Sequence, residues 1–165
     1  MRLETERLVL REMDRDDVEP LLGVFGDERV MASFASAPFD HAAMEHWVAR
    51  NLAHRHDHGY GLFTLVDKAD GTVIGDCGLE HIDIGAELGY DLRADRWGRG
   101  LATEAASAVR DFAFATLRLP RLVSLVRVGN QSSRRVAEKV GMNWREDVVR
   151  AGIRYWLMEL TAPEI

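Results

Sequence analysis

Two glycines near the middle of the chain separate a strand pattern from a helix pattern. Residues 86–92 alternate apolar with polar or glycine positions, and this period of two predicts a β-strand. After Gly98 and Gly100, an apolar stripe over residues 101–117 has helical spacing. Glycines at such a junction let the backbone approach a ligand, and the first helical turn offers unpaired N–H groups at the positive end of a dipole. The pattern therefore predicts a phosphate or pyrophosphate site over residues 98–103.

The other elements follow from the same kind of pattern. Asp14 and Asp40 can cap two helices, Asp70-Gly71 predicts a hairpin turn, and Gly141 is a candidate C-cap. The order indicates an α/β (α+β) fold with a mixed sheet in one domain spanning residues 1–165. Further strands are expected over residues 8–11, 60–66, 72–82, 122–128, 144–149 and 153–160, and a further helix over 130–140.

Composition narrows the class of protein. The formal net charge of −6 argues against general nucleic-acid binding and is compatible with a cationic amine substrate. No apolar run is long enough to span a bilayer, which argues against a membrane protein, and residues 1–7 are charged and lack a signal-peptide core. The single Cys77 excludes an internal disulfide and fits a reducing compartment. We therefore expect a cytoplasmic location.

Five segments carry a recognisable pattern in their order and spacing, and they are residues 5–11, 75–79, 87–90, 97–105 and 130–142. Together they resemble the GNAT superfamily of acetyl-CoA-dependent N-acetyltransferases, and most closely its RimJ/RimL type. The resemblance covers nearly the whole chain. The wider superfamily has Gln or Arg where this chain has Trp97. The RimJ/RimL group commonly has Trp there, so the departure narrows the subgroup.

The resemblance implies a fold and a co-substrate. It implies a GNAT-like, mostly antiparallel mixed sheet of about six or seven strands, flanked by about four helices, with a V-shaped splay between the fourth and fifth strands. It also implies acetyl-CoA as co-substrate, with no metal. Arg99, Arg134 or Arg135 could meet the nucleotide phosphates. The implied coenzyme-binding residues are Tyr90, Asp91, Leu92, Trp97, Gly98, Arg99, Gly100, Leu101, Ala102, Thr103, Asn130 and Ser133.

The implied reaction is direct attack of a primary amine on the thioester, so a group must accept a proton. We assign Glu87 as the base, directly or through a water, with Glu80 as the alternative. Ser133 matches the family's serine that donates to the leaving sulfur. A main-chain N–H near Gly89 or Tyr90 could stabilise the carbonyl oxygen.

Simpler interpretations compete with each assignment. The glycines could be turn residues, Glu87 a solvated strand residue, and Ser133 a helix cap. Residues 134–135 could be a solvated helix face, and the histidines between 54 and 58 are better explained as a polar helix end than as a metal site.

The sequence leaves alternatives for the acceptor, the oligomeric state and the activity. The acceptor could be a protein N-terminus, a peptide or a small amine such as an amino acid, an aminoglycoside or a polyamine. The chain could act as a monomer or a homodimer. A non-catalytic acyl-CoA-binding sensor of the same fold is the alternative to an enzyme.

Overall fold

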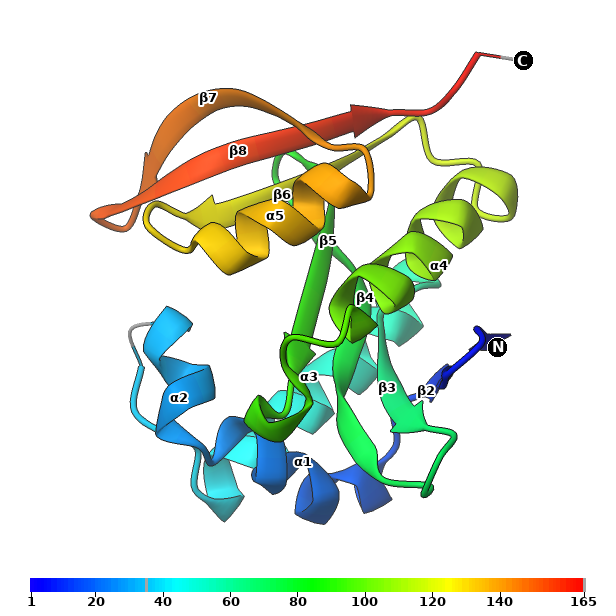
Figure 1. Cartoon of the computed structure of the whole chain (residues 1–165), viewed down its shortest axis with the longest axis vertical. Coiled ribbons are helices and arrows are strands. Elements are labelled where there is room, and N and C mark those ends of the chain that lie inside the picture. Colours follow the sequence, from blue (N-terminus) through cyan, green and yellow to red (C-terminus); the bar gives the residue numbers. More distant parts are fainter. Residues whose placement is uncertain (35, 165) are drawn as a thin grey trace.

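One eight-stranded sheet, in the order β1-β2-β3-β4-β5-β6-β8-β7, runs through the computed structural model, which describes residues 1–34 and 36–164 (Figure 1). The strands are β1 (Arg2–Glu4), β2 (Leu8–Glu12), β3 (Leu62–Asp67), β4 (Val73–Ile82), β5 (Gly85–Leu92), β6 (Arg121–Arg127), β7 (Asn143–Arg150) and β8 (Ile153–Thr161). The helices are α1 (Val18–Phe25), α2 (Glu28–Met31), α3 (His41–His58), α4 (Leu101–Ala115) and α5 (Gln131–Lys139). The predicted mixed α/β fold is confirmed.

Two short elements escaped the sequence analysis. Strand β1 has three residues and helix α2 has four, so neither shows a periodic apolar pattern. β1 forms by antiparallel pairing with β2, and α2 begins where the Asp27 side chain accepts the Arg29 N–H. With these two elements, the described residues form eight strands and five α-helices. The sequence analysis expected about six or seven strands and about four helices.

Two helical layers cover the two faces of the sheet (Figure 1). Helices α1 and α3 pack on one face, around a core that includes Leu21, Phe25 and Met44. Helices α4 and α5 lie on the other face, where Val109 and Ala137 belong to the main core. The sheet thus lies between two helical layers.

A buried polar network attaches the first helical segment to the sheet. The Asp17 side chain is 2% exposed and accepts hydrogen bonds from Arg11 at 2.7 and 3.0 Å. It also accepts the Thr64 hydroxyl at 2.7 Å and the Asp14 N–H at 2.9 Å. These bonds join the turn before α1 to β2 and β3, since Arg11 lies on β2 and Thr64 on β3.

The expected splay lies between β5 and β6. These strands are parallel and pair only at Ala86 with Leu122 and at Glu87 with Val123. They are the fourth and fifth of the predicted strands, and the additional β1 shifts their numbers by one. Every other pair of neighbouring strands is antiparallel, so the sheet opens at its one parallel junction.

Candidate active site

Two side chains bridge the strands where β5 and β6 part. The Glu87 carboxylate accepts the Leu125 N–H at 2.8 Å, and the Ser124 hydroxyl donates to the Leu88 carbonyl at 2.7 Å. Beyond them lies a cleft of about 950 Å³, walled by both strands, the loop before α4, and the first turns of α4 and α5. The parting thus creates a cavity in the middle of the sheet.

The glycine loop forms a concave main-chain surface at one end of this cleft. Gly98 and Gly100 have φ of 75° and 77°, a conformation that glycine adopts without strain. A Cβ placed on Gly98 would meet no atom within 4 Å, and on Gly100 only the Arg7 side chain at 3.6 Å. Helix α4 then starts at Leu101 without a side-chain cap, so its first amides have no side chain bonded to them. The loop is an open cradle for an anion.

Side chains hold this loop in place from outside. The Trp97 indole N–H donates to the Leu92 carbonyl at 3.0 Å. Arg7 donates to the Arg99 carbonyl at 2.9 Å and pairs with Glu104 at 2.8 Å. Trp97 therefore joins the loop to the end of β5, and Arg7 joins it to the first turn of α4.

The cleft brings together nearly all the residues predicted to hold the coenzyme. Arg99 is exposed and does not line the cleft. Arg134 does not line it either, because its guanidinium lies over the Trp156 ring, 4.6 Å from the centroid. The residues that line it are Tyr90, Asp91, Leu92, Trp97, Gly98, Gly100, Leu101, Ala102, Thr103, Asn130, Ser133 and Arg135.

Among the cleft-lining cations that the sequence analysis did not select, two form no ion pair with a described residue. Arg127 ends β6, and Lys139 follows Arg135 at a spacing of four on α5. Within residues 1–34 and 36–164, neither they nor Arg135 forms an ion pair. Lys139 could have been found from the sequence, because residues four apart on a helix lie on the same face and Arg135 was already a candidate.

Glu87 lies where burial changes its acidity. Desolvation raises the pKa of its carboxyl to about 7, against the opposing effect of the Leu125 hydrogen bond. Glu80 lies directly opposite in the β4–β5 register and is paired with Arg50 at 2.8 Å. Glu87 thus combines partial burial with a pKa suited to accepting a proton at neutral pH.

Ser133 lies on the first turn of α5 and contacts Tyr90 of β5, the strand that carries Glu87. The Tyr90 hydroxyl donates to the Ser133 carbonyl at 2.7 Å and lies 3.2 Å from its Oγ. Burial raises the pKa of Tyr90 to about 12, so the phenol keeps its proton. Asn130, not Ser133, caps α5, because its side chain accepts the Ser133 N–H at 3.3 Å. The Ser133 hydroxyl is therefore not used as a helix cap.

The histidines lie on the last turns of α3, as a polar helix end. His54 accepts the His81 N–H at 2.8 Å, and His58 stacks on His81 at 4.5 Å. No cluster of three or more potential ligands in the described part of the chain is placed to hold a metal ion. Cys77 is buried on β4. Among the described residues, no helix is long and apolar enough to cross a membrane.

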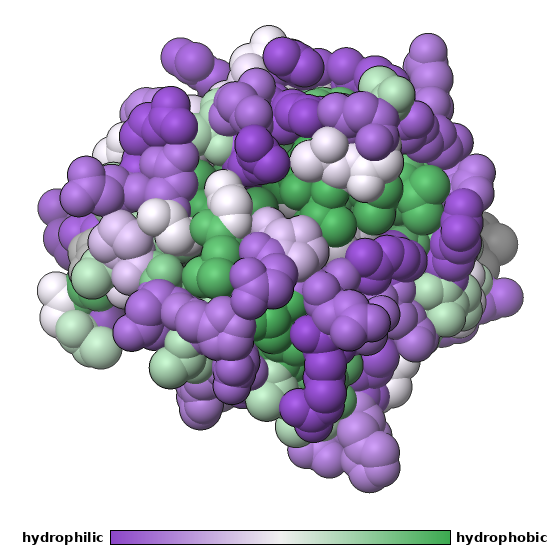
Figure 2. Space-filling view, turned by 90° about the horizontal axis from the view of Figure 1, so that it is seen from below, coloured by the Kyte–Doolittle hydropathy of each residue, from purple (hydrophilic) through white to green (hydrophobic). Residues whose placement is uncertain are grey.

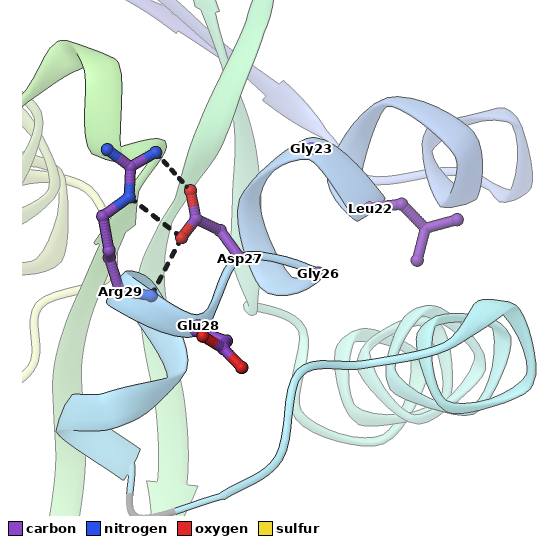
Figure 3. Close-up of a pocket in the computed structure, with 6 residues that line it drawn as sticks. All are labelled: Leu22, Gly23, Gly26, Asp27, Glu28 and Arg29. Atoms are coloured by element: carbon purple, nitrogen blue, oxygen red, sulfur yellow. Dashed lines mark hydrogen bonds and ion pairs between the residues drawn. The ribbon is translucent and has the colours of Figure 1, made fainter.

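A second, shallow pocket lies at the corner between α1 and α2 (Figure 3). Leu22, Gly23 and Gly26 form part of its wall. The Arg29 side chain folds back onto the Asp27 carboxylate there, with bonds of 2.7 and 3.1 Å. Seen from below, apolar surface lies between more hydrophilic residues (Figure 2). The shallow pocket brings no pair of catalytic groups together, so the cleft between β5 and β6 is the candidate active site.

Comparison with known proteins identifies the family. The family model for the acetyltransferase (GNAT) domain matches residues 7–143. The uncharacterized protein YkkB of Bacillus subtilis is 31% identical over 151 residues, which are 89% of this chain and 88% of that protein. The uncharacterized N-acetyltransferase p20 of Bacillus licheniformis is 33% identical over 135 residues, which are 79% of this chain and 76% of that protein.

Solved structures agree with this assignment. An acetyltransferase from Agrobacterium tumefaciens superposes with a TM-score of 0.84 at 32% identity, covering 97% of this chain and 94% of that one. The ribosomal-protein-S5-alanine acetyltransferase from Vibrio fischeri shares the fold, with a TM-score of 0.81 at 20% identity. Members of the GNAT family use acetyl-CoA and act on amines. The chain belongs to the GNAT acetyltransferase family and is an acyltransferase enzyme.

Proposed function

We propose that this chain, as a single domain, transfers an acetyl group from acetyl-CoA to a primary amine, either a protein N-terminus or a small amine. One observation carries the proposal. Glu87, with a pKa of about 7, lies where β5 and β6 part, in the same cleft as the bare glycine cradle. A base and an anion site in one cleft are what amine acetylation by a pyrophosphate-bearing thioester requires.

The residues of the cleft fit coenzyme A. The amides of residues 98–103 would hold the pyrophosphate, because Gly98 and Gly100 leave that surface free of side chains. Arg127, Arg135 and Lys139 would meet phosphate groups. The main chain of residues 90–92 and the Asn130 side chain would contact the pantetheine arm. Acetyl-CoA supplies the activated acetyl thioester when bound.

Two side chains of the protein then assist the reaction. Glu87 accepts a proton from the incoming amine, directly or through a water, as the new N–C bond forms. The Ser133 hydroxyl donates a hydrogen bond to the sulfur as the C–S bond breaks, and Tyr90 holds the Ser133 main chain at 2.7 Å. Direct transfer needs no nucleophile from the protein, which agrees with the complete burial of Cys77. Cys77 as the single cysteine supports a cytoplasmic location.

Two measurements test the proposal. Calorimetry with coenzyme A measures binding, and thiol release from acetyl-CoA measures turnover with a panel of small amines and N-terminal peptides. We expect binding and acceptor-dependent thiol release. Binding without turnover on any acceptor would favour an acyl-CoA sensor, and absence of binding would refute the assignment of the cleft.

A further inference from the structure

Four carboxyl groups face one another in two opposed pairs on one face of the β4–β5 ribbon. The register places Asp76 opposite Asp91, Gly78 opposite Gly89, and Glu80 opposite Glu87. Since side chains alternate along a strand, these residues point to the same face of the sheet. That is the α3 face, because Trp47 donates to Asp76 at 3.3 Å and Arg50 to Glu80 at 2.8 Å.

Directly opposed like charges destabilise a sheet, so this arrangement needs compensation. Glu80 receives it from Arg50. Asp91 forms no ion pair within residues 1–34 and 36–164, and Asp76, which is completely buried, has an Oδ1 that receives no hydrogen bond from any described donor. Burial and the neighbouring Asp91 raise the pKa of Asp76 well above its ordinary value, and burial also raises that of Asp91. Because two carboxylates placed directly opposite each other disfavour ionisation of both, the pair is suited to share one proton, and no cation among the described residues pairs with the charge that remains.

This charge faces the cleft through Asp91, which lines it together with Glu80 and Glu87. The arginines that line the same cleft near α2, the glycine loop and the β7–β8 turn are each paired with another carboxylate. They are Arg29 with Asp27 (Figure 3), Arg96 with Asp67, and Arg150 with Asp83. The cations of this cleft without an ion pair, Arg127, Arg135 and Lys139, lie on β6 and α5, and none of them pairs with Asp91 within residues 1–34 and 36–164.

The two acidic positions are well separated. Glu87 and Asp91 are four residues apart on one strand, which corresponds to about 13 Å between their Cα atoms. Between them, a Cβ on Gly89 would meet no atom within 4 Å, so the floor of the cleft is bare main chain at that point. A flexible methylene chain can lie over such a floor.

We propose that the acceptor is a linear amine with a second cationic nitrogen, held so that its reacting amine lies at Glu87 and its distal ammonium at Asp91. This inference rests on the proposed acetyl transfer and narrows its acceptor. The length of the ligand follows from the spacing of Glu87 and Asp91 along the strand. At about 1.2 Å per bond, the nitrogens of diaminooctane lie about 11 Å apart and those of diaminobutane about 6 Å apart, so only the longer molecule reaches both positions.

The test compares diaminooctane, diaminobutane and octylamine as acceptors for the wild-type protein. We expect kcat/KM for diaminooctane to exceed that for each of the other two by about tenfold or more, the effect of one charge-assisted hydrogen bond. Calorimetry of the same three amines in the presence of coenzyme A gives a readout that does not depend on turnover. Equal values for diaminooctane and octylamine, or better turnover of peptides that carry no second cation, would overturn the proposal.

Two matched variants test whether Asp91 binds the distal ammonium of the acceptor. Asp91→Asn removes the charge and should bring the ratio of diaminooctane to octylamine close to one. Asp76→Asn perturbs the same pair but leaves the charge on Asp91, so the preference should remain. Should Asp91→Asn fail to fold, the comparison of the three amines on the wild-type protein decides alone.

The outcomes separate this proposal from the one on which it rests. Acetylation of monoamines or peptides with no preference for diaminooctane would refute the two-cation acceptor and leave acetyl transfer standing. Absence of thiol release with every acceptor, or of coenzyme A binding, would overturn both.

Discussion

The Glu87 carboxylate accepts the main-chain N–H of Leu125 at 2.8 Å, at the point where β6 leaves β5. In a continuing sheet, a strand carbonyl would accept this N–H. The glutamate replaces that carbonyl, which both keeps a part-buried donor satisfied and holds the carboxylate where the two strands part. One hydrogen bond therefore links the defect in the sheet to the proposed base.

The pH dependence of turnover should report on Glu87. Burial raises the pKa of Glu87 to about 7, and a base must be deprotonated, so kcat/KM should rise as the pH passes through about 7. Glu87→Gln should remove this rise and lower turnover by about a hundredfold. The pH profile should be measured with two acceptor amines of different basicity. A rise that comes from Glu87 stays at the same pH with both amines, whereas a rise that comes from the amine moves with the pKa of the amine.

Glu80→Gln is the matched control for this experiment. Glu80 is already engaged by Arg50, so the rise near pH 7 should survive its replacement. If Glu80→Gln loses the rise in kcat/KM near pH 7, the base is Glu80 and not Glu87.

Glu87→Gln should also stabilise the folded protein at alkaline pH. The folded pKa of Glu87 is raised from 4.5 to about 7, so the folded state holds this proton more tightly than the unfolded state. Its contribution to stability is complete below about pH 4.5 and is lost as the pH rises through about 7. Glu87→Gln avoids that loss, and its free energy of unfolding at pH 8 should exceed that of the wild type by up to about 3 kcal/mol. Urea unfolding at pH 5 and pH 8 measures this; an equal difference at both values would contradict the burial argument.

Substitution in the glycine cradle should affect the coenzyme. Gly100→Glu places bulk and negative charge beside the proposed pyrophosphate site and should raise the KM for acetyl-CoA by about tenfold or more. Gly100→Asn is the control, since asparagine tolerates the φ of 77° found there and adds no charge. An unchanged KM for acetyl-CoA in Gly100→Glu would show that the phosphates bind elsewhere.

The Arg11–Asp17 pair should govern stability in acid. Burial alone would raise the pKa of Asp17, but hydrogen bonds from Arg11, Asp14 and Thr64 outweigh it and lower the pKa. The stabilisation is present above the ordinary pKa of an aspartate and is lost as the pH falls through the folded value. Arg11→Met leaves Asp17 buried without its cation and should cost about 3 kcal/mol at pH 7, measured by thermal or urea unfolding. Arg2→Met, at an exposed pair with Glu4, should leave the free energy of unfolding nearly unchanged.

Local chemistry explains which elements could be predicted. Asp40 accepts the Ala43 N–H and begins α3, and Gly71, at a φ of 75°, lies in the turn between β3 and β4. Caps and turns depend on residues close in the chain, so their signals can be read without the fold. The three-residue β1 had no such signal, because its hydrogen bonds come from β2.

The sequence by itself determined the glycine loop before a helix, the order of the strands and helices, and the family resemblance, since all three depend on residue types at fixed short spacings. The tertiary structure decided how far β5 and β6 stay paired, how deeply Glu87 is buried, and that Asp76 meets Asp91 across a strand pair. Burial and register bring together residues distant in the chain, and a carboxyl's pKa follows from that environment. The chemistry of this cleft is therefore a property of the folded sheet.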